Sequence, residues 1–328
     1  MPALPAPERG VSVDRRSVWP YVDGEPGEFI YSRYAHPTGA EAERALGGLE
    51  GGQALLFSSG SAATFALLLA LCSPGQTVAL AEGCYFGTGV MIREELGRWG
   101  LRSVEFDQTG PPPDGADLVW LEAPSNPFLT MPDFDAAAAH PARVVVDSTA
   151  ATPVYLRPLE HGADFVVHSA TKYLAGHSDA LAGAVVCREQ ADYDRLWQFR
   201  QRTGPACAAD VAALVSRGIK TLRVRIERQS ATAGVLAERL RAHPKVEVVR
   251  WPGFGGLLSF DVPGDPVPVE RAARTIKNAT SLGGVETTME SRHRWEGDRC
   301  PVGLLRLSVG LEDADELWAD LEQALENA

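Results

Sequence analysis

The sequence of 328 residues predicts an α/β fold with a large, mostly parallel sheet domain and a smaller C-terminal α/β domain. Three observations predict it. Short apolar runs alternate with helical patterns between residues 41 and 218, as in parallel sheets whose two faces are covered by helices. A long helical stretch from residue 219 opens a second group of strands and helices. The chain is also long enough for one large and one smaller domain.

The first 40 residues are rich in proline, glycine and charge, and we expect an irregular arm there. In the large domain a helix is expected within residues 58–75, where Pro74 and Gly75 mark its end. Seven apolar segments are predicted to contain strands: 53–57, 77–82, 102–107, 116–124, 142–149, 163–171 and 181–187.

In the smaller domain, residues 219–328, helices are expected over 219–243, near 268–278 and over 313–327. Strands are expected over 245–251, 255–262 and 304–309. The helical and strand patterns again alternate, which favours a second α/β unit rather than a bundle of helices.

The overall charge and cysteine content exclude several classes of protein. A formal net charge of −12 argues against nucleic acid as a partner, because phosphate binding needs a basic surface. The sequence has five cysteines and no CxxC pair, which argues against a disulfide framework and against a metal site. No secretion signal is visible, and no apolar run is long enough to cross a bilayer, so we expect a cytoplasmic protein without membrane contact.

Chemically useful side chains stand where the expected parallel strands end. Asp147 closes one strand, Lys172 follows another, and Asn126 follows a third. Gly60 and Ser61 open the helix after the first strand, where free backbone amides can bind an anion. Ligands gather at this edge of a parallel sheet.

The combination matches the needs of pyridoxal 5'-phosphate. Lys172 would bind the cofactor as a Schiff base, and Asp147 would pair with the protonated pyridine nitrogen. The hydroxyls of Ser169 and Thr171 would add hydrogen bonds to the phosphate. A solvated or structural role for Lys172 is the alternative.

With these residues in view, the chain resembles the Cys/Met-metabolism family of pyridoxal-phosphate enzymes, the cystathionine γ-lyase and γ-synthase group. The resemblance covers roughly residues 30–328. It depends on eight motifs in the family's order: YSRYAHPTGAEAERALGGLEGG, SSGSAA, EAPSNP, VVVDSTAATP, SATKYLAGHSD, RGIKTL, SLGGVET and LLRLSVGLED. It implies a fold-type I pyridoxal-phosphate transferase.

The resemblance also implies roles for individual residues. Lys172 would carry the cofactor and transfer protons, and Tyr85 would stack on the cofactor ring and assist proton transfer. A core position is the alternative for Tyr85. The remaining cofactor contacts would be Gly60, Ser61, Asp147, Ser169 and Thr171, with Tyr31 and Arg33 reaching the phosphate of a neighbouring subunit.

Arg306 lies inside an apolar strand, and the family pattern assigns it to the substrate carboxylate. Without that pattern an internal salt bridge to an acidic residue would be the preferred interpretation. Asn126 and the backbone of Ser281 would provide the other substrate and cofactor contacts. His177 is expected to be structural, because Lys172 and Tyr85 already supply proton transfer.

For the whole protein, the resemblance implies a homodimer or homotetramer with composite active sites and a small amino-acid substrate. We expect a carbon–sulfur lyase that carries out γ-elimination on cystathionine or a related amino acid, most similar to bacterial cystathionine γ-lyases. Gly87 stands where methionine γ-lyases carry cysteine, and Thr280 stands where many relatives carry glutamate. The short segment near Pro252–Gly256 is a further departure, so an unusual substrate is compatible with the sequence.

Three other functions stay open at this point. A γ-synthase or sulfhydrylase would replace the γ-substituent of an activated homoserine. An aminotransferase would use a keto-acid acceptor and release no thiol. A cofactor-binding protein without turnover is the most remote alternative, because it would not need Lys172, Asp147, Tyr85 and Arg306 together.

Overall fold

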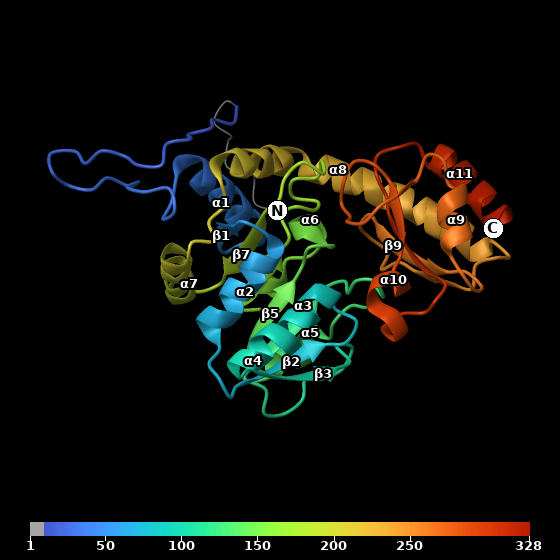
Figure 1. The fold of residues 1–328 in the computed structure, drawn as a ribbon, viewed down its shortest axis with the longest axis horizontal. Helices are drawn as coiled ribbons and strands as arrows, with labels where there is room; N and C mark the ends of the chain where they lie inside the picture. The colour runs from blue at the N-terminus through green and yellow to red at the C-terminus, as the bar shows by residue number, and fades with distance from the viewer. Residues whose placement is uncertain (1–9) are drawn as a thin grey trace.

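Two sheets organise the computed structural model, which describes residues 10–328 (Figure 1). The first sheet has seven strands in the order β1-β7-β6-β5-β4-β2-β3. These strands are β1 (Gln53–Phe57), β2 (Thr77–Ala81), β3 (Arg102–Phe106), β4 (Leu118–Glu122), β5 (Arg143–Asp147), β6 (Phe165–His168) and β7 (Gly183–Cys187). Each lies within a segment that the apolar runs predicted.

Most neighbours in this sheet run parallel. The strands β3, β2, β4, β5 and β6 form parallel pairs, whereas β7 is antiparallel to both β1 and β6. The largely parallel α/β fold predicted from the sequence is therefore confirmed. The carboxyl ends of β4, β5 and β6 consequently meet at one edge of the sheet.

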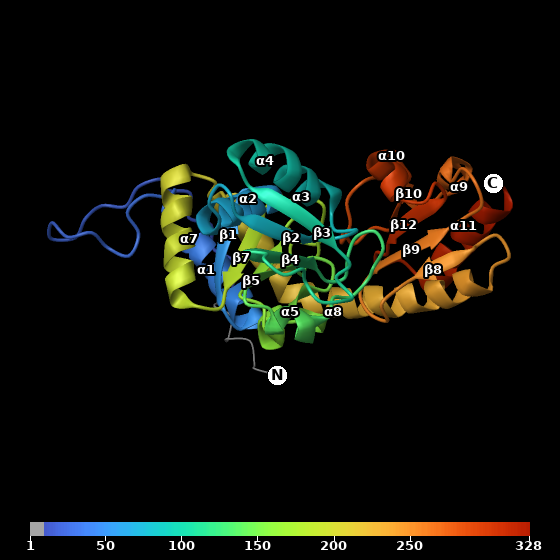
Figure 2. The ribbon, with the colours of Figure 1, turned by 90° about the horizontal axis from the view of Figure 1, so that it is seen from below.

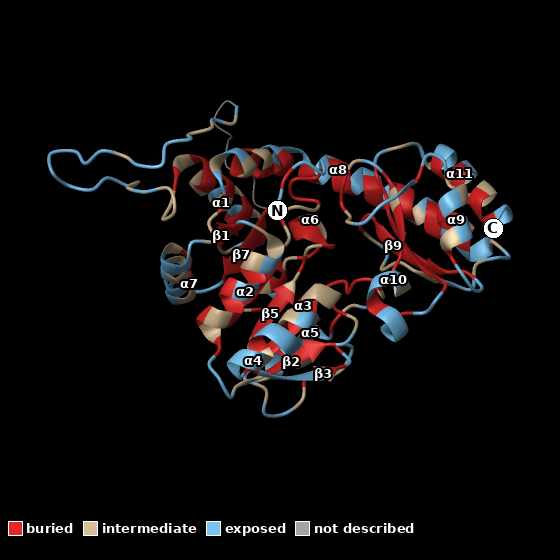
Figure 3. Cartoon of the chain, in the orientation of Figure 1, coloured by how far each residue is buried: buried red, intermediate tan, exposed pale blue. Residues whose placement is uncertain are grey.

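Helices bury both faces of this sheet, as Figure 3 shows by the red strands at its centre. Along β1, Leu55 and Phe57 belong to the apolar core on one face, whereas Ala54 and Leu56 belong to the core on the other. This alternation is the period of two that a strand imposes. The helical segments of this part are α1 (Pro37–Glu50), α2 (Gly60–Leu71), α3 (Phe86–Val90), η1 (Met91–Glu95), α4 (Leu96–Trp99), α5 (Phe134–Ala139), α6 (Thr152–Tyr155), η2 (Pro158–His161) and α7 (Gln190–Thr203).

The second sheet has five strands in the order β10-β11-β12-β9-β8. Its pairs are antiparallel except β10 with β11. Helices α8 and α11 pack together beside it over a third apolar core. The elements are α8 (Ala209–Ala242), β8 (Val248–Arg250), β9 (Leu257–Asp261), α9 (Val267–Ala272), β10 (Lys277–Asn278), β11 (Thr288–Ser291), α10 (His293–Glu296), η3 (Gly297–Arg299), β12 (Leu304–Ser308) and α11 (Ala314–Glu326).

The helix expected near residues 268–278 is shorter than predicted, because α9 ends at Ala272. The carboxylate of Asp320 in α11 accepts the backbone N–H groups of Arg274, Thr275 and Ile276, each at 2.8 Å to its nearer oxygen. These three amides therefore have hydrogen-bond partners without being part of a helix, and the chain continues into β10. A contact with α11 thus overrides the local helical pattern.

The helix α8 connects the two sheets, and Figure 2 shows its C-terminal part running below the second sheet. It begins ten residues before the expected start at Ile219, so the expected boundary between residues 218 and 219 falls inside it. Gly218 does not end a helix here. A Cβ at Gly218 would lie 2.2 Å from the carbonyl oxygen of Leu174, so the glycine allows close packing instead.

Residues 10–36 leave the body of the protein and return to it (Figure 1). Isolated bridges join Val18 to Tyr31 and Val22 to Glu25, but no helix or longer strand forms in this segment. Val18 and Val22 are 62% and 67% exposed. The chain is thus irregular over residues 10–36, but the arm expected over the first 40 residues ends earlier because α1 begins at Pro37, and residues 1–9 lie outside the described part of the chain.

No helix within residues 10–328 has both the length and the apolar character needed to cross a membrane.

Candidate active site

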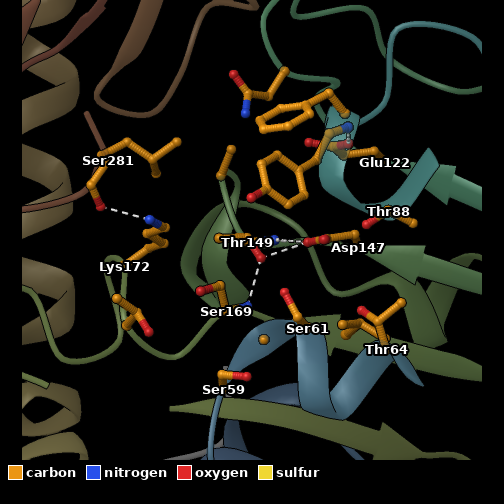
Figure 4. Close-up of a pocket in the computed structure, with 18 of the residues that line it drawn as sticks. Ser59, Ser61, Thr64, Thr88, Glu122, Asp147, Thr149, Ser169, Lys172 and Ser281 are labelled. Atoms are coloured by element: carbon orange, nitrogen blue, oxygen red, sulfur yellow. Dashed lines mark hydrogen bonds between the residues drawn. The ribbon is translucent and has the colours of Figure 1, made fainter. Parts of the chain in front are cut away.

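A cavity of about 370 Å³ lies at the carboxyl ends of β4, β5 and β6, facing the second sheet. All the predicted site residues except Tyr31 and Arg33 line it, and Figure 4 shows a set of these side chains. The predicted residues in the wall are Gly60, Ser61, Tyr85, Asn126, Asp147, Ser169, Thr171, Lys172, Ser281 and Arg306.

Lys172 follows the buried strand β6 and points toward the second sheet. Its Nζ donates a hydrogen bond to Ser281 Oγ at 2.6 Å (Figure 4). Burial and, to a smaller extent, the positive charge of Arg306 together lower the pKa of Lys172 to about 8. A substantial share of this amine is therefore neutral near pH 8, as a nucleophile or a general base requires.

Asp147 is the last residue of β5, and its carboxylate lines the cavity. Burial raises its pKa above the ordinary range, while hydrogen bonds from Thr149 oppose that rise. The Thr149 hydroxyl donates to Asp147 Oδ1 at 2.5 Å and accepts the Ser169 N–H at 2.8 Å. Sequence reasoning missed Thr149, although a threonine two residues after a strand-end aspartate is a recognisable turn signal.

Tyr85 lies immediately before α3 and is 38% exposed. Its ring meets that of Phe86 edge-on, with centroids 5.1 Å apart. The backbone N–H of Tyr85 donates to Glu122, a buried residue at the end of β4. Burial raises the pKa of Glu122 well above its usual value, with the nearby charge of Asp147 adding to the rise. Glu122 was not predicted either, although it occupies the strand-end position beside Asp147.

The first turn of α2 provides a cradle for an anion. The hydroxyl of Ser59 caps the helix by accepting the Ala62 N–H at 3.0 Å. A Cβ added at Gly60 would lie 3.0 Å from Ser169 Cβ, so glycine lets the helix terminus approach the loop after β6. Ser61 and Ser169 place hydroxyls at the same wall, as Figure 4 shows. A helix N-terminus with free amides suits a phosphate group.

Thr171 also lines the cavity, but its hydroxyl is already engaged. It donates to the carbonyl oxygen of Ala182 and accepts the Ala182 N–H, both at 3.1 Å. In this arrangement it has no proton to offer a phosphate. His177, expected to be structural, forms a 2.7 Å hydrogen bond with the carbonyl oxygen of Ala175 and does not line the cavity.

Arg306 is 4% exposed, and its guanidinium donates to three partners within the chain. Its Nη1 donates to Asn126 Oδ1 at 3.0 Å, and its Nη2 donates to Ser281 O at 2.8 Å. The same Nη2 forms an internal salt bridge with Glu290 Oε2 at 2.9 Å. Burial lowers the pKa of Arg306 to about 10. Glu290 was not foreseen, because its strand β11 lacks an apolar run.

Ser281 joins two of these groups, because its hydroxyl contacts Lys172 and its carbonyl oxygen contacts Arg306. Its backbone has φ +86°, a region that residues other than glycine seldom occupy. Such a conformation persists only where surrounding contacts hold it.

Tyr31 and Arg33 do not line the cavity of their own chain. The guanidinium of Arg33 donates to the carbonyl oxygen of Gln201 and lies 5.3 Å and 5.1 Å from the ring centroids of Tyr31 and Tyr34. These residues form their own cluster at the base of the arm.

The residues of the cavity fit pyridoxal phosphate. Its aldehyde needs an amine, its pyridinium nitrogen needs a carboxylate, and its phosphate needs a cradle of amides and hydroxyls. Lys172, Asp147 and the Gly60–Ser61 turn present these three groups to one cavity. Burial raises the pKa of Asp147 and so disfavours its charged form. A positively charged partner such as the pyridinium nitrogen would stabilise that charged form.

Comparisons with known proteins agree with this chemistry. The family model for the Cys/Met metabolism PLP-dependent enzymes matches residues 12–326. A putative cystathionine gamma-lyase of Streptomyces coelicolor is 38% identical, with 93% of this chain and 86% of the relative covered. An L-methionine gamma-lyase of Pseudomonas putida is 36% identical, with 92% and 86% covered.

A solved structure is similar over nearly the whole chain. It is cystathionine gamma synthase from Xanthomonas oryzae pv. oryzae, in complex with aminoacrylate and cysteine, with a TM-score of 0.91 and 30% sequence identity. The match covers 96% of this chain and 92% of that one. The chain therefore belongs to the Cys/Met metabolism PLP-dependent enzyme family, and it is a pyridoxal-phosphate enzyme that acts on a small amino acid.

Proposed function

We propose that this enzyme is a carbon–sulfur lyase that carries out γ-elimination on cystathionine or a closely related amino acid. With cystathionine, the bond between sulfur and the γ-carbon breaks, and water completes the conversion to cysteine, 2-oxobutyrate and ammonia. The supporting observation is one cavity with a lysine of lowered pKa, an acidic strand end and a buried arginine. The 38% identity with a putative cystathionine gamma-lyase supports the choice of substrate.

In this proposal, Lys172 and Asp147 hold the cofactor at its aldehyde and its pyridine nitrogen. Bound pyridoxal phosphate supplies an electron sink for negative charge that develops at the substrate Cα. Gly60, Ser61 and Ser169 would hold the phosphate, and Tyr85 would contact the ring.

Substrate binding and proton transfer use residues of both sheets. Arg306, positioned by Asn126 and Ser281, binds the substrate α-carboxylate. Lys172 Nζ transfers protons to and from the substrate carbons between Cα and the γ-substituent. It can both accept and donate a proton because burial keeps its pKa near 8. Tyr85 delivers a proton to the departing sulfur.

A second candidate is γ-replacement, in which a thiol takes the place of the γ-substituent. The similarity to a solved cystathionine gamma synthase favours it. Both reactions use the same residues up to the loss of the γ-substituent, and they differ in whether a thiol or water captures the remaining fragment.

The arm supports a composite active site in a homodimer or homotetramer. Arg33 and Tyr31 stand away from their own cavity, and the exposed Val18 and Val22 offer apolar surface to a second copy. We propose that Arg33 and Tyr31 reach the phosphate site of the neighbouring subunit. A mixture of Arg33→Ala and Lys172→Ala chains, refolded together, should then regain part of the activity that each variant alone lacks.

We also propose that the enzyme acts in the cytoplasm. All five cysteines are free and buried, which is usual in a reducing compartment.

The deciding experiment incubates the holoenzyme with L-cystathionine and identifies the products. Cysteine with 2-oxobutyrate and ammonia supports γ-elimination, whereas homocysteine with pyruvate means β-elimination. Lys172→Ala is the control and should form neither set. If cystathionine stays intact, the next assay uses an O-activated homoserine with and without an added thiol. A product that contains the thiol means γ-replacement, and no product in either case means that the proposed function is wrong.

A further inference from the structure

A second buried guanidinium, that of Arg292, lines the cavity together with Arg306. Arg292 is 2% exposed and stands between β11 and α10. Its Nη1 donates to Glu290 Oε2 at 2.9 Å, and its Nε and Nη2 donate to Glu296 Oε1 at 3.2 and 3.0 Å. A guanidinium has five N–H groups, so one hydrogen on each Nη lies outside these bonds.

The carboxylates that neutralise Arg292 do not form the cavity wall. Neither Glu290 nor Glu296 is among the residues that line it, whereas both Arg292 and Arg306 are. Glu290 Oε2 accepts from Nη2 of Arg306 and from Nη1 of Arg292, each at 2.9 Å. One carboxylate oxygen thus holds two guanidinium groups side by side, and a ligand in the cavity meets both of them.

Aromatic side chains border this part of the cavity. The guanidinium of Arg292 lies 5.8 Å from the ring centroid of Phe86. The indole of Trp295 donates to Glu290 Oε1 at 2.6 Å, although the residue is 52% exposed. Phe86 and Trp295 both line the cavity. Their rings offer apolar contact to methylene groups and to sulfur.

The segment that carries Arg292 is also fixed to the first sheet. Arg299, a few residues further on, donates to both carboxylate oxygens of Glu105 in β3, at 3.2 and 2.9 Å. The position of Arg292 therefore depends on the docking of the two sheets, and it is set before a ligand arrives. A preorganised guanidinium loses little entropy when it binds a carboxylate.

We propose that Arg292 binds a carboxylate at the far end of the substrate side chain. The enzyme then selects amino acids whose departing thiol carries a carboxylate over those that release a plain alkyl thiol. This inference extends the proposed function, in which Arg306 binds the α-carboxylate. The two guanidiniums suit a dicarboxylate, and the aromatic rings suit the chain between its ends.

A binding measurement tests the subsite without turnover. L-2-Aminoadipate and L-norleucine are similar in length and differ in the terminal carboxylate, and neither has a γ leaving group. Calorimetry on the holoenzyme should give tighter binding of aminoadipate. Arg292→Gln should weaken aminoadipate binding by about 10- to 100-fold, the range for a hydrogen bond to a charged group, and leave norleucine unchanged. Arg292→Lys keeps the charge of the cluster, so its affinity for aminoadipate should lie between those of the wild type and Arg292→Gln.

Arg294→Gln is the matched control. This neighbour pairs with Glu270 at 2.9 Å, is outside the cavity wall and has a side chain 43% exposed. It should leave the preference for aminoadipate intact. Equal binding of the two ligands by the wild type overturns the proposal. So does an equal loss for both ligands in Arg292→Gln and Arg292→Lys, because a purely structural arginine would affect them alike.

Turnover provides the second measurement. The values of kcat/KM for S-(2-carboxyethyl)-L-homocysteine and S-propyl-L-homocysteine should differ in favour of the carboxylate, and Arg292→Lys should reduce that ratio mainly through KM. A ratio that Arg292→Lys leaves unchanged contradicts the subsite. If the wild type turns over neither thioether nor L-cystathionine, the proposed lyase function is wrong, and the aminoadipate comparison still decides the role of Arg292.

Discussion

The hydroxyl of Thr149 donates to Asp147 Oδ1 at 2.5 Å and accepts the backbone N–H of Ser169 at 2.8 Å (Figure 4). One side chain thereby connects the carboxylate proposed for the pyridine nitrogen with the loop proposed for the phosphate. Thr149 sets the position of Asp147 relative to Ser169, although the sequence analysis assigned no role to Thr149.

Thr149→Val should weaken cofactor binding by about tenfold or more, because the bond to the Asp147 carboxylate and the bond from the Ser169 N–H are both lost while the volume stays nearly the same. The measurement is titration of the apoenzyme with pyridoxal phosphate, followed by absorbance. Thr149→Ser retains the hydroxyl and should bind the cofactor nearly as well as the wild type. Equal affinities for the valine and serine variants would show that these bonds do not position Asp147.

The rate at which apoenzyme combines with pyridoxal phosphate should depend on the ionisation of Lys172. Only the neutral amine reacts, so the rate should rise as the pH passes upward through about 8, the lowered pKa of Lys172. Stopped-flow absorbance between pH 6.5 and 9.5 measures the midpoint.

The variant Arg306→Gln removes a charge that lowers this pKa, so its midpoint should move to higher pH. Arg239→Gln is the control, since Arg239 pairs with Asp315 on the surface of the smaller part of the chain and does not line the cavity. A midpoint that stays near 8 in Arg306→Gln would contradict the electrostatic explanation.

Glu122 is expected to work mainly as an uncharged acceptor for the Tyr85 N–H. Its pKa is raised well above the ordinary value by burial, so a neutral side chain of the same shape should replace it. Glu122→Gln should therefore keep most of the turnover, whereas Glu122→Ala should reduce kcat by about 10- to 100-fold, since the partly buried amide of Tyr85 loses its partner. A glutamine variant as inactive as the alanine variant would mean that the negative charge is required.

Gly218→Ala should destabilise the protein, although alanine in a helix normally stabilises by roughly 0.5–1 kcal/mol relative to glycine. The new Cβ would lie 2.2 Å from the Leu174 carbonyl oxygen and 2.4 Å from that of Ala175. Relieving such overlap costs about 1–3 kcal/mol, so the Tm should fall. Gly48→Ala in α1 is the control: its Cβ meets nothing within 4 Å, and its Tm should rise or stay constant.

The inner strands of the first sheet were predictable because they are short apolar runs, as burial of both faces demands, whereas the edge strand β3 is mostly exposed. Strand β11 was not predictable, because Thr288, Glu290 and Ser291 interrupt its apolar character. That strand forms because β12 pairs with it, and Glu290 is buried because Arg306 and Arg292 neutralise its charge. No local pattern reports a contact of this kind.

By itself the sequence determined which reactive side chains stand at strand ends, since a strand, its last residue and the following turn are local features. This is why Lys172, Asp147 and the Gly60 turn could be named as candidates before their positions were known. The tertiary structure decided which groups share a hydrogen bond across the chain, such as Arg306 with Asn126, 180 residues apart. It also decided that Arg292 faces the cavity while its carboxylate partners stand behind it. Such arrangements depend on how the second sheet docks against the first, because buried charges are tolerated only where packing brings their partners within reach.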